Sequence, residues 1–513
     1  MFDYDVIWVG DRRVGYRRAG KGPMVVMLHG SPESSAALAP LQSELSQRFT
    51  TLAIDTPGNG ISDPLAHVDP LASDYAHALA ETFDALKIER AGVYGFHTGA
   101  GTAMEFALLY PDRVEALALD GYAIWTEAER KTLLDSYLVS FAPQLDGSHL
   151  SQLWARLEDQ ATFFPWNDRS EAARLNMDLP SLAVQHRRAI EWLGVGDHYI
   201  APYRSAFYRR GEIGPDQVRC PTLIGATPPD PLWTHLDRIG ERSAQLETEI
   251  WSGPRDHAFA AISSFLSRHV TAGPPSAQSI SQRPDGVEEG VVDTPHGRLH
   301  WQGELGAGDT ALYLHGAGES LAYWARNDFT DDNGFDDAVL RFSLPGHGLS
   351  TGTAPDSLTD WADGIEAGLD VLNQSVQRVV ARGFGALIGA ELQRRGRVET
   401  VEFVDQPIPK AHLRAAYQSH FLPELTPRWD GTHLITVWRW LRRRCLFEPW
   451  FEPSKDNAIT DWRHVDAHEL NARLVDVFRA QDSMRVAFQL QHSADPATLS
   501  SAAKARNVRS KQS

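Results

Sequence analysis

The chain contains a set of short motifs twice in the same order, and this internal repeat constrains the fold more than any other feature. His29-Gly30 follows an apolar run over residues 24–28, and His315-Gly316 follows another over 311–314. Three further pairs keep nearly the same spacing: Pro57-Gly58-Asn59-Gly60 with Pro345-Gly346-His347-Gly348, Gly95-Phe96-His97 with Gly383-Phe384-Gly385, and Asp146-Gly147-Ser148-His149-Leu150 with Asp430-Gly431-Thr432-His433-Leu434. Because separate motifs share one order and one spacing, the sequence predicts two copies of a single fold.

The length of 513 residues supports two domains, because a single hydrophobic core stops growing well below that size. We expect a first domain over residues 1–270 and a second over 291–494, joined by a Pro-, Ser- and Gly-rich linker over 271–290. The chain ends before counterparts of the last two strands of the first copy, so the second copy is predicted to be truncated and degenerate. Residues 495–513 lack apolar periodicity and are expected to form a disordered tail.

Each copy alternates strand-like and helix-like segments, which predicts an α/β fold with a mostly parallel sheet covered on both faces. In the first copy, residues 122–212 interrupt this alternation with Trp, Phe and Leu at helical spacing. We expect these residues to form a helical cap over the strand ends. A matching cap is expected at about 407–494 in the second copy.

The segment Gly95-Phe96-His97-Thr98-Gly99 joins an apolar strand to a helix through two flanking glycines. This is the pattern of a nucleophile elbow, in which a sharp strand-to-helix turn presents the central side chain at the top of the sheet. The usual serine is replaced by His97. The apex requires a positive φ, which is uncommon for residues with a Cβ, although His is among the enriched exceptions.

Residues 15–270 resemble the α/β-hydrolase superfamily. The resemblance rests on His29-Gly30, the segment 55–63, the elbow, the cap, a late aspartate and a terminal histidine, in the order that the family uses. The sequence looks most like a bacterial subgroup with His-Thr-Gly-Ala at the elbow and an Asp-Gly-Ser-His-Leu motif in the cap. The resemblance implies an α/β-hydrolase fold with a helical cap, present twice, the second copy being truncated.

The resemblance also implies roles for individual residues. The backbone N–H groups of Ser31 and Thr98 would form an oxyanion hole. Asp230 would be the catalytic acid and His257 the catalytic histidine. Apart from the resemblance, Asp120 at the end of the strand after the elbow helix is an alternative acid, although its match with Asp405 in the second copy favours a structural role. His149 has a twin, His433, in the second copy, so a structural role at the start of a cap helix is expected for it.

Three chemical roles are open for His97. It could be a nucleophile that forms an acyl-imidazole, an acid–base partner of His257, or a metal ligand together with His257 and Asp230. No short-spaced metal motif and no phosphate-binding glycine loop occurs, so neither a metal nor a cofactor is expected. The opposing hypothesis is a decayed site, as in the second copy, where Gly385 is expected at the apex.

The function predicted from these residues is hydrolase-type chemistry on a small, partly apolar ester, lactone or C–C substrate, with histidine in place of the serine nucleophile. One alternative is a non-catalytic ligand-binding or scaffold pseudoenzyme. Another is a cofactor-free lyase or isomerase that uses His97 and His257 as acid and base. The residues alone do not decide whether the protein is an enzyme.

The net charge of −18 argues against nucleic acid and anionic membranes as partners, so a small-molecule substrate is expected. The two copies are expected to pack together as a pseudo-dimer. Two cysteines, the absence of a long apolar run and the absence of a signal-like N-terminus together favour the cytoplasm.

Overall fold

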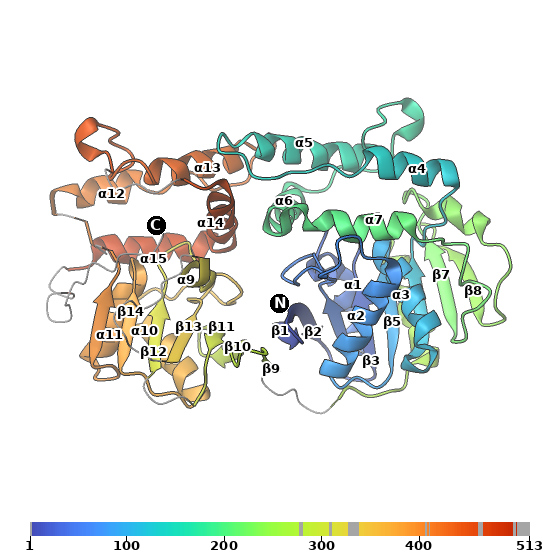
Figure 1. Ribbon diagram of the computed structural model, residues 1–513, viewed down its shortest axis with the longest axis horizontal. Helices are drawn as coiled ribbons and strands as arrows, with labels where there is room; N and C mark the ends of the chain where they lie inside the picture. The colour runs from blue at the N-terminus through green and yellow to red at the C-terminus, as the bar shows by residue number, and fades with distance from the viewer. Residues whose placement is uncertain are drawn as a thin grey trace. The chain divides into compact units, whose positions relative to one another are not determined.

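The computed structural model describes residues 3–275, 281–306, 310–326, 338–405, 408–409, 411–459, 465–495 and 499. The chain divides into two compact units, the first made of Met1–Ala142 and His149–Ser279, the second of Pro143–Ser148 and Ile280–Ser513 (Figure 1). Within the expected linker and tail, residues 276–280, 496–498 and 500–513 lie outside the described residues.

The first unit is built on an eight-stranded sheet with the order β1-β2-β4-β3-β5-β6-β7-β8. All neighbours from β4 to β8 run parallel, whereas β1 and β2 pair antiparallel at one edge. The strands are β1 (Asp3–Val9), β2 (Arg12–Ala19), β3 (Met24–Leu28), β4 (Thr50–Ile54), β5 (Ala91–Phe96), β6 (Val114–Asp120), β7 (Thr222–Ala226) and β8 (Leu246–Ile250).

Both faces of this sheet are covered by helices, which explains why its central strands are continuous apolar runs. Successive side chains of β3 point to opposite faces: Val26 and Leu28 enter one hydrophobic cluster, and Val25 and Met27 enter the other. Helices α2 (Ala72–Ala85) and α3 (Thr98–Leu109) contribute to the first cluster, and α1 (Ala39–Leu45) and α8 (Arg255–His269) to the second. The core therefore lies in two layers around one sheet.

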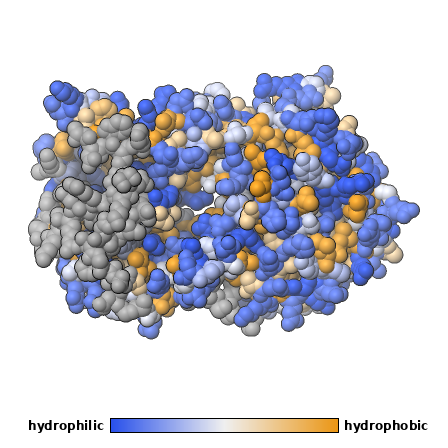
Figure 2. All heavy atoms as spheres, in the orientation of Figure 1, coloured by the Kyte–Doolittle hydropathy of each residue, from blue (hydrophilic) through white to orange (hydrophobic). Residues whose placement is uncertain are grey.

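Four α-helices lie between β6 and β7, within the residues that the sequence assigns to a cap (Figure 1). They are α4 (Glu127–Ser136), α5 (Ser148–Thr162), α6 (Leu182–Val195) and α7 (Ile200–Tyr208). On the face of the first unit drawn in Figure 2, apolar side chains are scattered among hydrophilic ones, as is normal for a protein surface. No helix among the described residues is long and apolar enough to cross a membrane.

The second unit contains a seven-stranded sheet with the order β15-β14-β12-β13-β11-β10-β9. From β15 to β10 this order repeats that of β6-β5-β3-β4-β2-β1 in the first unit. The strands are β9 (Ser281–Gln282), β10 (Glu288–Thr294), β11 (Gly297–Gly303), β12 (Thr310–Leu314), β13 (Ala338–Phe342), β14 (Arg378–Ala381) and β15 (Thr400–Phe403). The helices are α9 (Ala322–Arg326), α10 (Leu358–Val371), α11 (Phe384–Arg394), α12 (Arg414–His420), α13 (Thr432–Arg444), α14 (Ala467–Arg479) and α15 (Gln481–Ser493). Counterparts of β7 and β8 are absent from the described residues of this unit.

The turn from β14 to α11 corrects one expectation: the counterpart of His97 is Gly383, not Gly385. Gly383 has φ 51° and ψ −124°, close to the φ 49° and ψ −110° of His97. A Cβ on Gly385 would lie 2.6 Å from the carbonyl oxygens of residues 314 and 315, just as one on Gly99 would crowd those of residues 28 and 29. The shared Gly-Phe dipeptide therefore aligned the two copies two residues out of register.

Candidate active site

His97 occupies the apex of the sharp turn between β5 and α3. The two flanking glycines are required by close backbone contacts, because a Cβ on Gly95 would lie 2.4 Å from the Gly99 carbonyl oxygen. One on Gly99 would lie 2.5 Å from the Leu28 carbonyl oxygen. His97 itself holds φ 49°, a conformation that costs a residue with a Cβ about 1–3 kcal/mol. The elbow geometry is thus present with a histidine at its centre.

His97 and Asp230 form a direct pair. The His97 Nε2–H donates to Asp230 Oδ2 at 2.6 Å, and Asp230 Oδ1 accepts from the backbone N–H of Leu232 at 2.8 Å. The imidazole also stacks on the ring of Phe96, with centroids 3.9 Å apart and planes at 19°. The His97 side chain is 30% exposed and that of Asp230 11%. One nitrogen of the ring is therefore fixed by a carboxylate, and Nδ1 is left as the nitrogen that can exchange a proton.

Each partner shifts the pKa of the other. Burial by itself would lower the pKa of His97, but the Asp230 carboxylate outweighs it and the pKa is raised above the usual histidine value. Burial would likewise raise the pKa of Asp230, yet the His97 cation and the Leu232 N–H hold that pKa below its usual value. The charged form of the pair, imidazolium with carboxylate, is stabilised by folding.

These shifts predict how the pair contributes to stability at different pH values. The raised pKa of His97 stabilises the fold fully below its unfolded pKa, and this contribution is lost as pH rises through the folded pKa. The lowered pKa of Asp230 contributes above its unfolded pKa and is lost as pH falls through the folded pKa. We expect Asp230→Asn to reduce the free energy of unfolding by about 1–3 kcal/mol near pH 5.5 and by less near pH 9. Urea unfolding of wild type and variant at both pH values measures this difference, and a deficit that grows with pH would contradict it.

Two further glycines make room for the imidazole. A Cβ on Gly121 would lie 2.4 Å from His97 Cδ2 and 2.8 Å from Nε2. One on Gly30 would lie 3.2 Å from His97 Cβ. Gly121 follows β6 directly and has φ +67°. The ring therefore reaches Asp230 only because no side chain stands between them, a requirement that sequence reasoning missed.

The structure does not bring His257 to this pair. His257 is exposed on α8, and its Nδ1–H donates to the Ser252 carbonyl at 3.1 Å. It does not line the cavity that contains His97. The side chain of α8 that turns toward the elbow is Arg255, two residues earlier, which stands over the ring of Phe96. Arg255 had been missed, and the interpretation of His257 as the histidine beside the acid finds no support in this geometry.

Asp120, the alternative acid, is committed elsewhere. Its side chain is fully buried, forms an ion pair with Arg255 and accepts a hydrogen bond from the Tyr94 hydroxyl at 2.9 Å. Its carbonyl oxygen accepts from the His97 backbone N–H at 2.9 Å. Asp120 therefore supports the elbow through its backbone, whereas Asp230 supplies the carboxylate to the imidazole.

The expected oxyanion donors are only partly available. The Ser31 N–H donates to the Thr98 side-chain hydroxyl at 2.7 Å, and that hydroxyl donates to Ser31 Oγ at 3.1 Å. The Thr98 N–H is at the first position of α3, where helix geometry provides no intrahelical acceptor. Of the two donors that the resemblance implies, the Ser31 N–H is occupied by the Thr98 hydroxyl, and the Thr98 N–H has no partner within its helix.

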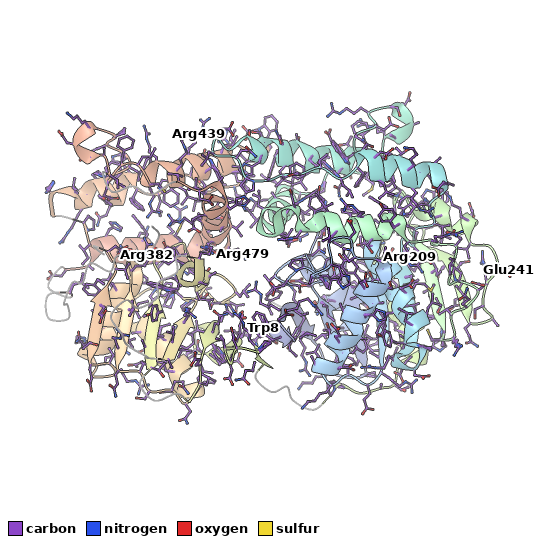
Figure 3. All side chains as sticks on the ribbon, viewed as in Figure 1. Trp8, Arg209, Glu241, Arg382, Arg439 and Arg479 are labelled. Carbon is purple, nitrogen blue, oxygen red and sulfur yellow. The ribbon has the colours of Figure 1, made fainter. Side chains whose placement is uncertain are left out.

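A cavity of about 280 Å³ opens over His97. Apolar side chains make up most of its wall. Seven of them are aromatic, mostly from the cap, namely Phe96, Trp125, Tyr137, Phe164, Trp192, Tyr203 and Phe207. Charged residues also line it, namely Glu33, Asp178, Arg188, Arg209 and Asp230. Arg188 pairs with Glu33 at 2.5 Å, and Arg209, beneath α7 in Figure 3, donates to the Tyr122 hydroxyl at 2.7 Å. Such a wall suits a small, partly apolar ligand.

The described residues contain no group of three or more His, Cys, Asp or Glu side chains placed to hold a metal ion. The metal role considered for His97 required His257 as a second imidazole, and His257 lies elsewhere. His149 and His433 are both buried near the starts of α5 and α13, and His149 does not line the cavity.

The corresponding place in the second unit carries charged side chains. Gly383 presents no side chain, and its N–H donates to Asp405 Oδ1 at 2.9 Å. Arg382, labelled in Figure 3, pairs with Glu319 at 3.4 Å and with Asp405 at 3.3 Å. Neither an imidazole nor another nucleophile stands at the apex of this unit.

Comparison with known proteins agrees with this architecture. Residues 23–184 match the family model described as the alpha/beta hydrolase fold. An uncharacterized protein of Mycobacterium tuberculosis (strain ATCC 25618 / H37Rv) is 37% identical over 109 residues, which cover 20% of this chain and 32% of that protein. The 2-(acetamidomethylene)succinate hydrolase of Mesorhizobium japonicum is 32% identical over 128 residues, covering 25% of this chain and 46% of that protein. The chain thus spans 32% and 46% of the length of these two curated relatives.

Among solved structures, epoxide hydrolase A from Mycobacterium thermoresistibile superposes with a TM-score of 0.43 at 18% identity, covering 53% of this chain and 100% of that one. The strand order, the elbow after β5, the cap between β6 and β7 and the family-model match lead to one conclusion. The chain has the α/β-hydrolase fold, and His97 occupies the apex of the turn between β5 and α3.

Proposed function

We propose that the first unit is a hydrolase-type enzyme that acts on a small, partly apolar ester, lactone or C–C substrate. The observation that carries this proposal is the hydrogen bond of 2.6 Å between His97 and Asp230 at the elbow, facing the aromatic cavity. An imidazole oriented by a carboxylate is the standard arrangement for general-base work. The similarity to a relative named as a hydrolase supports the same reaction class.

In the proposed mechanism His97 acts as a general base on water. Nε2 is held by Asp230, so Nδ1 takes a proton from a water molecule as its oxygen attacks the substrate carbonyl carbon. The imidazolium that forms is stabilised by the Asp230 carboxylate. The Thr98 N–H, at the N-terminus of α3, donates to the developing oxyanion. The bond to the leaving group then breaks, and the proton on Nδ1 passes to that group.

The nucleophilic role, with an acyl-imidazole on His97, is the alternative within the same reaction class. The imidazole is longer than a serine side chain, and it is already held against Asp230 and Phe96. These contacts favour the base over the nucleophile. Mass spectrometry after rapid quenching separates the two roles, because only the nucleophile gives a peptide acylated at His97. The lyase or isomerase alternative depended on His257 as a second acid–base group, which this geometry does not provide.

A panel of aryl and alkyl esters, lactones and β-diketones tests the proposal on wild type, His97→Ala, His97→Ser and the exposed control His257→Ala. We expect wild-type hydrolysis to fall about 10²- to 10⁴-fold in His97→Ala, the usual contribution of a general base. His257→Ala is expected to retain wild-type activity, because its side chain lies outside the cavity. Hydrolysis that appears only in His97→Ser would overturn the proposal and indicate a hydrolase that has lost its nucleophile.

A non-catalytic ligand-binding protein is the second candidate. It is favoured by one observation, the occupation of the Ser31 N–H by the Thr98 hydroxyl. A binding protein would give saturable binding of panel compounds, seen as quenching of the cavity tryptophans, without turnover in wild type. It would also bind equally well with His97→Ala.

For the second unit we propose a degenerate, truncated copy without catalytic function. The repeated strand order and the shared apex conformation of His97 and Gly383 support a common origin by duplication. The absence of a side chain at Gly383 supports the loss of chemistry there.

A further inference from the structure

Arg255 links helix α8 to the elbow. Its guanidinium lies 5.6 Å from the ring centroid of Phe96 and 5.5 Å from that of Phe259, one helical turn later. The Phe96 ring in turn stacks on the imidazole of His97, with ring centroids 3.9 Å apart. The orientation of the imidazole is therefore connected to Arg255 through a single aromatic ring.

The same guanidinium neutralises a buried carboxylate beside the elbow. Asp120 has no exposed side-chain surface, and its partners are Arg255 and the Tyr94 hydroxyl. The backbones of Asp120 and His97 are joined by a hydrogen bond of 2.9 Å, so this carboxylate belongs to the immediate surroundings of the imidazole. Burial raises the pKa of Asp120 and Arg255 opposes that shift, so Arg255 favours the ionised form of Asp120 and balances its charge beside His97.

The charged and titratable groups around His97 come from several elements. Asp120 on β6, Asp230 after β7 and Arg255 on α8 act on it directly, and Tyr94 on β5 is bonded to Asp120. His235, in the short helix Trp233–Arg238, also interacts with it, and burial lowers the pKa of His235 to about 4. The other charged residues that line the cavity are Glu33, Asp178, Arg188 and Arg209. Glu33 and Arg188 pair with each other, and Asp230 pairs with His97. The remaining balance beside the imidazole is set by Asp120 and Arg255.

We propose that Arg255 is a positioning residue of the His97–Asp230 dyad, which orients the imidazole through Phe96 and offsets the charge of Asp120. This inference rests on the proposed function for its catalytic consequence, but its effect on His97 exists whether or not the protein is an enzyme. The opposing contributions to the pKa of His97 agree with it, since Asp120 raises that pKa and Arg255 lowers it.

The test compares Arg255→Gln, Arg255→Lys and the matched control His257→Gln, which changes an exposed residue of the same helix turn. The first readout is the pKa of His97, followed by NMR in full-length protein labelled at histidine and assigned with His97→Gln. We expect Arg255→Gln to raise this pKa by about one unit, because a positive charge that lowers it is removed. Arg255→Lys keeps the positive charge, so its His97 pKa should lie close to that of wild type. His257→Gln should leave the His97 pKa unchanged.

The second readout is the pH profile of kcat on any substrate that the panel identifies. The basic form of His97 is required, so the acidic limb of the profile should move to higher pH by the same amount in Arg255→Gln. Arg255→Lys should retain the limb position but lower kcat about 3- to 10-fold, because an ammonium lacks the planar surface that stacks on Phe96.

If Arg255→Gln does not fold, the double variant Asp120→Asn, Arg255→Gln removes both charges of the buried pair. The pKa of His97 in this variant should lie within about half a unit of wild type, because the two removed charges act in opposite directions. An unchanged His97 pKa in folded Arg255→Gln, or a raised one in the double variant, would overturn the inference. A failure of the proposed function is distinguishable, because it removes only the kcat readout and leaves the NMR titration to decide.

Discussion

Replacing Asp230 by asparagine is expected to reduce kcat/KM for hydrolysis by about 10²- to 10⁴-fold, nearly as much as removing the imidazole. Asparagine keeps the shape of the side chain and can still hydrogen bond to His97, but it lacks the charge that stabilises the imidazolium. It can also present its N–H₂ group to Nε2, which would leave the proton on Nδ1 and remove the base. Steady-state kinetics from pH 5 to 9, on the substrate found with the panel, measures the loss.

Asp178→Asn is the matched control for that variant. Asp178 lines the same cavity, but it is exposed, and no interaction with His97 is found among the described residues. We expect its kcat/KM to stay within about threefold of wild type, as is usual for a surface substitution. Equal losses in both variants would show that the cavity needs negative charge in general rather than the His97–Asp230 hydrogen bond.

The fold was predictable because its signals are local and repeated. Continuous apolar runs such as residues 24–28, followed by helical periodicity, are sufficient to indicate a parallel sheet covered on both faces. Between β6 and β7 the alternation of strand-like and helix-like segments is interrupted by a long stretch with helical periodicity, and this indicates the cap. The register of the second elbow was not predictable, because a Gly-Phe dipeptide occurs at a different phase of the turn in each copy. The apex glycine, Gly383, is distinguished from Gly385 by its positive φ and by its distance from the carbonyl oxygens that crowd Gly385, and both are properties of the folded backbone.

The site was predictable for those residues whose position is fixed by the topology of the fold. His97 and Asp230 follow strands β5 and β7, and because these strands run parallel, both residues lie at the carboxyl ends of the strands. The histidine after β8 was different, because its orientation depends on the helical phase of α8. Arg255 and Phe259 are four residues apart on one side of α8, and the guanidinium lies over the rings of both Phe259 and Phe96. His257 lies about halfway round the helix from them. This spacing is the signal that could have identified Arg255, because it places a cation one helical turn from an aromatic ring. The buried residues Ala258 and Ile262 mark the side of α8 that packs on the core.

The occupied oxyanion donor could not have been predicted. The hydrogen bond from Ser31 N–H to the Thr98 hydroxyl joins two loops far apart in the sequence, and its existence depends on the rotamer of one threonine. Sequence patterns assign the backbone donors of a turn, but they do not show which donors a neighbouring side chain already occupies.

Gly121→Ala is expected to abolish the dyad without altering either of its members. The new Cβ would lie 2.4 Å from His97 Cδ2 and 2.8 Å from Nε2, so the ring must leave the position from which it reaches Asp230. The alanine must also hold φ near +67°, which adds strain. We expect kcat/KM to fall at least about 10²-fold, as for loss of the base, and the free energy of unfolding to fall by about 1–3 kcal/mol. Kinetics and urea unfolding of the variant measure the two effects separately.

Gly10→Ala separates backbone strain from the collision with the imidazole. Gly10 has nearly the same backbone angle, φ +63°, but a Cβ there would meet nothing within 4 Å. It should therefore lose about 1 kcal/mol of stability through strain and keep full activity. If Gly121→Ala retained activity, the imidazole would have to work from a position away from Asp230, and the hydrogen bond at the elbow would not be the catalytic arrangement. A histidine at this elbow can therefore reach Asp230 only if residue 121 has no side chain, because a Cβ there would occupy the place of the imidazole.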